Sequence, residues 1–218
     1  MKKLLALSLA ASLLIPLSAS AGIVNWTNWS NSSTGTTSQN GNSITVTYTG
    51  ETFGIDNDAA IFNDVPSSFT NAEVSNTPGK NGALLMQGGA TQVLNTFRFS
   101  SAVINPYINL FSVGQPSIAV QFYFTNATPE ILAQGAGHWG PGSLTQSGNL
   151  ITGSEGNGLL KFTGTFTEIS FYTPIHEYYY GGTIGLADSV SVPEPTTLSL
   201  MLMGALAVFA RRRKIQSH

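Results

Sequence analysis

Hydrophobic and polar side chains alternate along several short stretches of this chain, which is the pattern of β-strands that bury one face. The alternation is perfect over residues 44–49 and less regular over residues 118–124. Aromatic side chains mark two further predicted strands, at residues 95–100 and 107–113. Between the two terminal segments, no stretch keeps the helical spacing of apolar residues over several turns. The pattern predicts an all-β fold, an antiparallel β-sandwich of jelly-roll type.

The apolar stretch that starts at Leu160 changes its parity along the chain. Between residues 160 and 166 the apolar side chains fall on even positions, whereas Ile169 and Phe171 fall on odd ones. Since successive strand residues point to opposite faces, a strand through this stretch needs one irregular step. We expect a β-bulge or a change of register near Thr167.

Asparagine, serine, threonine and glycine concentrate in two stretches that we interpret as loops. Residues 29–43 are interpreted as a long loop or a disordered segment, which leaves residues 22–28 as an edge strand. Residues 71–82, with Pro78-Gly79 and Asn81-Gly82, form the second predicted loop. We expect one β-sandwich ectodomain over residues 22–190, followed by a short linker.

Charge and cysteine content exclude several classes of protein. Only 9% of the 218 residues are charged, against roughly 25% in an ordinary soluble domain. There is no cysteine, so disulfides, thiolate catalysis and cysteine-ligated metals are excluded. Between Gly22 and Val192 three basic side chains stand against ten carboxylates. Such a body lacks the positive surface that nucleic acid requires, and we expect no nucleic-acid partner.

The first 21 residues have the layout of a secretory signal peptide. Lys2 and Lys3 supply the positive start, residues 4–17 are mostly apolar, and Ala19 and Ala21 form an A-x-A cleavage site. We expect a signal helix at residues 1–21, export by the Sec machinery and cleavage after Ala21.

The C-terminus combines three features in a fixed order. A Val-Pro-Glu-Pro motif precedes an apolar run at residues 198–210, which is short of the ~20 residues that span a bilayer comfortably. Four consecutive cations follow the run and favour a cytoplasmic tail, with the body on the outside. The motif and the cluster consist of Pro193, Glu194 and Pro195, and of Arg211, Arg212, Arg213 and Lys214.

These features together resemble the PEP-CTERM sorting signal of Gram-negative bacteria, with residues 191–218 as the signal. The resemblance implies that Pro193, Glu194 and Pro195 are the recognition motif of the membrane enzyme exosortase, that residues 198–210 are a transmembrane helix, and that Arg211, Arg212 and Arg213 form a retention cluster. It also implies transient anchoring in the inner membrane, then release to the cell surface or extracellular matrix, in association with exopolysaccharide and biofilm. The alternative is a proline-rich linker before a permanent anchor.

Two groups of aromatic side chains are candidates for contact with a glycan. Trp139 lies in a glycine-rich loop, residues 135–142, whose backbone can approach a ligand closely. Tyr178 and Tyr180 would share one exposed surface if this segment were a strand. The alternatives are a tryptophan that plugs the end of the sandwich and tyrosines that pack across strands.

Acidic and histidine side chains give weaker indications of chemistry. Asp56 and Asp58, with Glu51 and Asp64 nearby, offer oxygen ligands for a structural calcium ion, although the EF-hand loop pattern is missing. A plain acidic turn is the alternative, and we expect no other cofactor. With His138 and His176 alone in the body, a three-histidine zinc site is excluded.

The sequence therefore leaves three hypotheses for function. The first is a non-catalytic surface or matrix protein associated with exopolysaccharide, and the second is a lectin-like carbohydrate-binding module. The third is a polysaccharide-processing enzyme, which would need two carboxylates at a suitable separation, for example from among Glu155, Glu168 and Glu177. We expect the chain not to be an enzyme.

Overall fold

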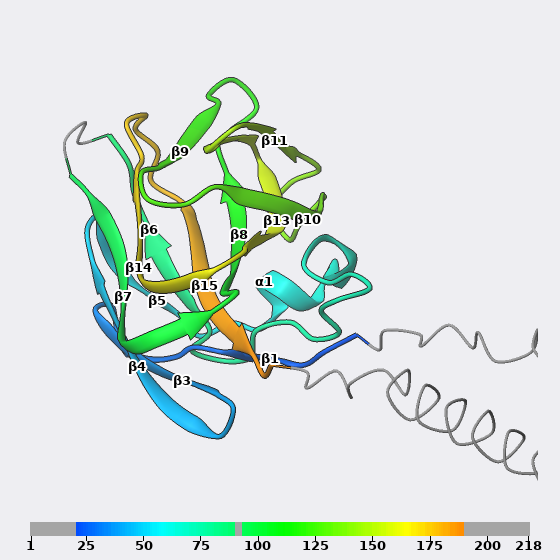
Figure 1. The fold of residues 1–218 in the computed structure, drawn as a ribbon. Helices are drawn as coiled ribbons and strands as arrows, with labels where there is room; N and C mark the ends of the chain where they lie inside the picture. The colour runs from blue at the N-terminus through cyan, green and yellow to red at the C-terminus, as the bar shows by residue number, and fades with distance from the viewer. Residues whose placement is uncertain (1–20, 90–92, 190–218) are drawn as a thin grey trace, which may run out of the picture. The chain divides into compact units, whose positions relative to one another are not determined.

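The computed structural model describes residues 21–89 and 93–189. In this part of the chain the fold is almost entirely antiparallel β, arranged in two sheets (Figure 1). The helical segments there are one turn of α-helix, α1 (Ala60–Asn63), and a 3-10 turn, η1 (Pro66–Ser68). No described helix is therefore a candidate for crossing a membrane.

The first sheet has seven strands, and we call it the seven-stranded sheet. Its order is β10 (Pro129–Gly135), β13 (Gly156–Phe162), β8 (Tyr107–Val113), β15 (Tyr180–Ala187), β6 (Ala83–Met86) and β5 (Thr52–Asp56). β1 (Val24–Trp26) pairs with the last residues of β15.

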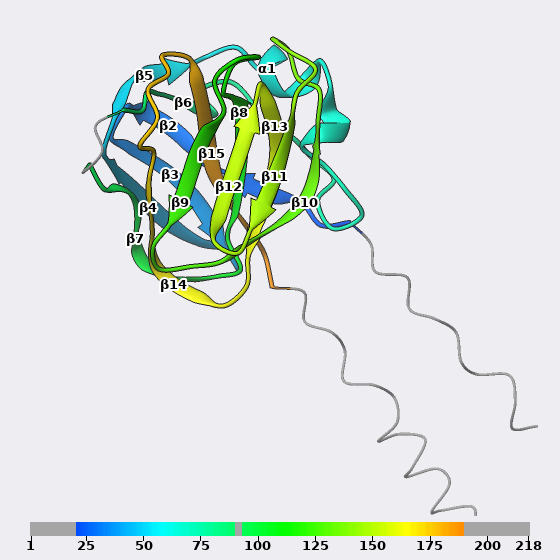
Figure 2. The ribbon, with the colours of Figure 1, turned by 90° about the horizontal axis from the view of Figure 1, so that it is seen from above.

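The second sheet has eight strands, and we call it the eight-stranded sheet. Its order is β11 (Ser143–Ser147), β12 (Leu150–Ser154), β9 (Val120–Phe124), β14 (Thr165–Tyr172), β7 (Asn95–Ile104), β4 (Asn42–Thr49), β3 (Thr34–Gln39) and β2 (Asn28–Asn31). Figure 2 shows the strands of both sheets from above.

The main hydrophobic core contains side chains of both sheets. Phe162 from the seven-stranded sheet packs edge-on against Phe124 from the eight-stranded sheet, with ring centroids 5.0 Å apart. Phe122 and Phe171 continue this aromatic packing along the eight-stranded sheet. Because each aromatic ring removes a large apolar surface from water, burial of this layer stabilises the fold.

The outer face of the seven-stranded sheet, turned away from the main core, is also covered. One smaller cluster joins Phe62 of α1 and Phe69 to Phe111 of β8, and another joins Val24 and Val74 to Tyr107. As a result β8, β13 and β15 are buried along nearly their whole length, whereas β4 alternates between buried and exposed residues.

The structure confirms the all-β antiparallel class and most of the predicted strands. Residues 44–49 lie in β4, residues 95–100 in β7, and β8 covers the predicted 107–113. β9 begins at Val120, later than expected, because Ile118 pairs back with Gln115 in a turn. The jelly-roll type stays a prediction, as do the helices at residues 1–21 and 198–210, which lie outside the described residues apart from Ala21.

The loop predicted at residues 29–43 is wrong. This segment forms β2, β3 and the start of β4, and Trp29 is buried at 1% exposure. Asn40 and Gly41 have positive φ angles of 54° and 75°, the conformation of a tight hairpin turn. The Asn-Gly pair was the signal for this hairpin, and the polar composition around it concealed the strands.

The stretch beginning at Leu160 is two strands rather than one. β13 ends at Phe162, and after a turn at residues 163–164 the chain enters β14 of the other sheet. Gly164 has a φ of 131°, which favours glycine at this turn. The irregular step predicted near Thr167 is confirmed, since the register of β14 against β7 shifts between Phe166 and Glu168.

Candidate functional site

Four rings from three separate segments form a continuous series at one end of the seven-stranded sheet. We call Phe53, Tyr179, Trp139 and His138 the open row. Successive ring centroids are 6.5, 5.0 and 4.8 Å apart. Phe53, Tyr179 and Trp139 remain 49%, 41% and 39% exposed, so they present an apolar surface to solvent.

The open row rests on the covered outer face of the sheet. Trp139 packs on Phe111 of β8 at a centroid distance of 5.5 Å, and Phe111 packs edge-on against Phe62 of α1 at 5.6 Å. Phe111 and Phe62 are almost fully buried. Trp139 is therefore supported from below by close-packed rings.

Glycine allows the loop of Trp139 to lie against the turn between β12 and β13. A Cβ at Gly142 would be 1.8 Å from the Ser154 carbonyl oxygen, and one at Gly140 would be 2.2 Å from Glu155 Oε2. The contact at Gly142 is with backbone, so the close approach there requires glycine, whereas a Cβ at Gly140 would displace the Glu155 side chain. The glycine-rich sequence thus fixes the position of Trp139.

Glu177 anchors the loop that carries Tyr179. The residue is 3% exposed, and its Oε2 accepts a 2.9 Å hydrogen bond from the amide of Gly114. Burial raises the pKa of the Glu177 carboxyl, hydrogen bonds to it act in the opposite direction, and the negative charge of Glu155 raises the pKa further. This carboxylate is a structural anchor of the loop.

The open row ends in a contact between a histidine and a carboxylate. His138 Nδ1 contacts Asp64 Oδ2, just after α1, while the imidazole also packs edge-on against Trp139. Both partners are partly exposed, so the pair holds the loop to α1 while remaining accessible to water.

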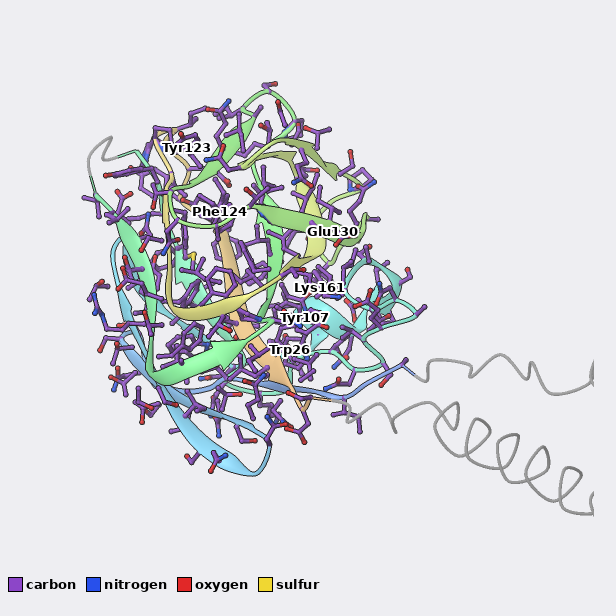
Figure 3. The ribbon with its side chains drawn as sticks, in the orientation of Figure 1. Trp26, Tyr107, Tyr123, Phe124, Glu130 and Lys161 are labelled. Carbon is purple, nitrogen blue, oxygen red and sulfur yellow. The ribbon has the colours of Figure 1, made fainter. Side chains whose placement is uncertain are left out.

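A second row of side chains crosses the same sheet nearer the chain ends. Register places Trp26, Tyr107, Lys161 and Glu130 side by side on β1, β8, β13 and β10, with Gly185 of β15 between the first two, and Figure 3 shows them in this order. We call these four residues the sealed row.

The loop at residues 71–76 covers part of the sealed row. Lys161 Nζ pairs with Glu73 Oε2 at 2.5 Å, and Trp26 Nε1 donates a 3.1 Å hydrogen bond to the carbonyl of Asn76. The hydrogen bond to Glu73 raises the pKa of Lys161, although burial of the amine acts in the opposite direction. The covering loop thus supplies partners for the polar atoms beneath it.

A cleft of about 810 Å³ opens at the other end of β10 and β11, lined by residues 125–128, 148–149, Thr163 and Phe166. Asn126 in its wall is engaged by the backbone of β14, donating to the Glu168 carbonyl and accepting from the Ser170 amide, both at 3.0 Å. Because both polar atoms of the Asn126 side chain already bind backbone groups, the open row is the better candidate site.

Of the three predicted glycan contacts, two are exposed and one is buried. Trp139 lies in the open row, and Tyr178 is 67% exposed and packs against His176. The exposed position predicted for Tyr180 is wrong, because Tyr180 is fully buried in the main core against Phe122. β15 begins only at Tyr180, so strand alternation does not extend back to Tyr178.

Two members of the open row escaped the sequence-based prediction. Tyr179 takes the role expected of Tyr180, and Phe53 reaches it from β5, far away in the sequence. A single phenylalanine between Thr52 and Gly54 carries no local signal of such a role.

Asp56 and Asp58 bind backbone amides in this structure. Asp56 Oδ1 accepts from the amide of Asp58 at 2.7 Å, and Asp58 Oδ1 accepts from the amide of Ala60 at 2.8 Å. These bonds form the turn that leads into α1. Within residues 21–89 and 93–189, no three histidine or carboxylate side chains gather as a metal site would need. The calcium ion stays a prediction.

The two terminal signals fall mostly outside the described residues. These include Ala19, the motif Pro193, Glu194 and Pro195, and the cluster Arg211, Arg212 and Arg213. The described chain starts at Ala21, and the amide of Gly22 donates a 2.8 Å hydrogen bond to the carbonyl of Glu73. The predicted mature N-terminus therefore lies directly against the fold.

Comparison with known proteins identifies the C-terminal segment. Residues 191–214 match the family model of the PEP-CTERM protein-sorting motif, which confirms the resemblance seen in the sequence. No curated protein and no solved structure matches the chain. The molecule is thus a two-sheet antiparallel β protein with a C-terminal sorting motif. The motif indicates an exosortase-sorted protein of the cell surface.

Proposed function

We propose that this chain is a non-catalytic surface or matrix protein that binds extracellular polysaccharide through the open row. The observation that carries the proposal is the series of partly exposed rings from Phe53 to His138, held in place by close-packed residues below. A soluble β-sandwich normally buries such rings, so their exposure indicates a surface for a partner.

The chemistry of the open row suits a sugar chain. One face of a pyranose ring consists of C–H groups, which pack on an aromatic ring as other apolar surfaces do. The hydroxyl groups around the ring edge then remain free to bind neighbouring polar atoms. Successive rings are 4.8 to 6.5 Å apart and are tilted or perpendicular to one another, so the row offers both ring faces and ring edges to a sugar chain.

The proposal of a non-catalytic role draws on Glu177, one carboxylate that a glycosidase mechanism could have used. Glu177 is buried and accepts a hydrogen bond from the amide of Gly114. This carboxylate therefore has a structural role. A hydrolytic alternative would require turnover of a polysaccharide that is lost in Glu155→Gln or Glu177→Gln.

The test of saccharide binding compares two exposed aromatic residues. Trp139→Ala should weaken binding of the polymer secreted by the producing cells at least tenfold, or about 1.4 kcal/mol. Tyr123→Ala is the matched control, because Tyr123 is 46% exposed on β9 of the other sheet and lies outside the open row (Figure 3). Equal binding by the two variants, measured by sedimentation with the polymer, would refute the proposal.

For sorting, the proposal is that Sec exports the chain and that Arg211, Arg212 and Arg213 retain it in the inner membrane until exosortase acts at Pro193, Glu194 and Pro195. Replacing the three motif residues with Ala should leave full-length protein in the membrane. Replacing the three arginines with Ser should let unprocessed protein escape, since an arginine costs about 2.5–3.5 kcal/mol at a helix centre. Retention of residues 198–218 on wild-type surface protein would show a permanent anchor instead.

A further inference from the structure

The carboxylates around the open row narrow the kind of polysaccharide that it binds. Asp64 pairs with His138 at one end of the row. Glu155 lies against Gly140, beside Trp139, so closely that a Cβ there would be 2.2 Å from Oε2. Asp56 is near enough to Tyr179 for its charge to raise the pKa of the phenol, after the larger effect of burial. Negative charge therefore accompanies the rings along the row.

Two of the three lysine and arginine side chains in the described part of the chain form ion pairs away from the open row, and the third, Lys80, is exposed in the loop before β6. Arg98 pairs with Glu168 on the eight-stranded sheet, and Lys161 pairs with Glu73 in the sealed row. The ring and ion-pair contacts of the open row in these residues include a histidine but no lysine or arginine. An acidic polysaccharide would thus meet charge of its own sign.

Building on the function proposed above, we infer that the open row binds an amino-sugar polysaccharide, a hexosamine polymer that carries free ammonium groups. An ammonium group over the face of a tryptophan or tyrosine is attracted by the ring, and the nearby carboxylates add to the attraction. The C–H faces of the same sugar units pack on the remaining rings. One surface therefore recognises both the apolar and the cationic parts of such a chain.

The inference makes binding selective between polymers that differ only in charge. A fully N-acetylated hexosamine chain offers the same C–H faces without the ammonium groups, and a uronate chain offers a negative charge instead. Because the row is partly exposed, salt should weaken the preference; the screening length is about 10 Å at 0.1 M ionic strength.

The experiment measures binding of the full chain, in mild detergent, to chitin, chitosan and oligogalacturonate oligomers of equal length. The pH is held at about 5, above the usual carboxyl pKa of about 4 and below the pKa of the amino-sugar ammonium group, so that carboxylates and ammonium groups are both charged. We expect chitosan to bind about tenfold more tightly than chitin at low salt, the preference to shrink as salt is added, and oligogalacturonate to bind most weakly.

Two charge-neutralising variants locate the effect. Asp56→Asn combined with Glu155→Gln keeps the shape of both side chains, and it should reduce the preference for chitosan to about twofold or less. Glu130→Gln is the control, since it removes an exposed carboxylate from the sealed row and should keep the preference. Thermal melting of each variant confirms that the fold is intact.

The results separate this inference from the proposed function. If chitin and chitosan bind equally, or if Asp56→Asn with Glu155→Gln preserves the preference, the inference is wrong while saccharide binding stands. If chitosan binding is lost equally in Glu130→Gln, the attraction comes from overall charge and the inference is also wrong. If neither these oligomers nor the secreted polymer binds in a manner that depends on Trp139, the proposed function fails as well.

Discussion

The open row and the sealed row lie over the same sheet, and both combine aromatic with charged side chains, yet they differ in what covers them. In the sealed row Tyr107 is 6% exposed, and the loop at 71–76 provides a carboxylate for Lys161 and a carbonyl for Trp26. In the open row the three largest rings remain 39–49% exposed. One strand, β8, thus contributes Tyr107 to a closed structural cluster and Phe111 to the buried support of the exposed open row.

This difference shows that residue type alone does not mark a binding surface. Tryptophan, tyrosine and charged residues occur in both rows. These side chains can contact a partner only where no loop of the same chain covers them and binds their polar atoms. Covering a row stabilises the fold by removing apolar area from water. Leaving a row uncovered gives up that stability, which is reasonable where a ligand will occupy it.

The largest expected effect comes from the residue below the open row. Phe111→Ala removes a fully buried ring that contacts both Phe62 and Trp139. The free energy of unfolding should fall by about 3–5 kcal/mol, as for other buried aromatic residues. Trp139→Ala should cost much less, because its ring is partly exposed. Urea unfolding of both variants checks the order; a reversed order would mean that the open row is itself part of the core.

A smaller effect is expected from the loop that positions Trp139. Gly142→Ala introduces a Cβ at 1.8 Å from the Ser154 carbonyl oxygen, so the backbone must shift. A cost of about 1–3 kcal/mol is typical of such overpacking. The displaced loop should weaken saccharide binding, and the fluorescence emission of Trp139 should change with it. Gly79→Ala serves as the comparison for close contact, because a Cβ there meets nothing within 4 Å and the backbone at Gly79 has no positive φ angle. Unchanged binding in Gly142→Ala would show that the row tolerates a displaced loop.

The smallest effect concerns the ion pair of the sealed row. Lys161→Met should lower the free energy of unfolding by only about 0.5–1 kcal/mol near neutral pH, since the partner Glu73 is half exposed. The hydrogen bond to Glu73 raises the pKa of Lys161 in the folded protein. The amine of Lys161 therefore binds its proton more tightly in the folded state than in the unfolded state. The contribution is therefore present below the unfolded pKa of about 10.4 and is lost as the pH rises through the folded pKa.

Denaturant unfolding at increasing alkaline pH checks this prediction. The difference between wild type and Lys161→Met should narrow as the amine of Lys161 loses its proton. A difference that stays constant with pH would mean that the methylene stem of Lys161, rather than its charge, supports the covering loop.

The sequence predicted the fold class, because alternation and the absence of helical spacing are local properties. It failed at residues 29–43, where Thr and Ser side chains occupy both faces of β3 and the buried positions of that strand are Gly35, Thr37 and Gln39. Polar residues in buried strand positions give no alternation to detect. The strands there are fixed by pairing with β4 and by the burial of Trp29.

The candidate site was predictable only in part. Trp139 stood out because glycines surround it within one short loop. Phe53 and Tyr179 depend on a meeting of β5 with the segment before β15, which no local pattern encodes. The sealed row was hidden for the same reason, since Glu73 and Lys161 are 88 positions apart.

The last strand of the domain separates the open row from the C-terminal end of the described chain. β15 starts directly after Tyr179, and it ends at Ala187, which is paired with Val24 of β1. Its eight residues span about 26 Å at the usual rise of a strand. Figure 2 shows this strand running from the side of β5 and α1 toward the end where the described chain stops. The open row, which adjoins the start of β15, therefore lies about one strand length from the C-terminal end of this strand.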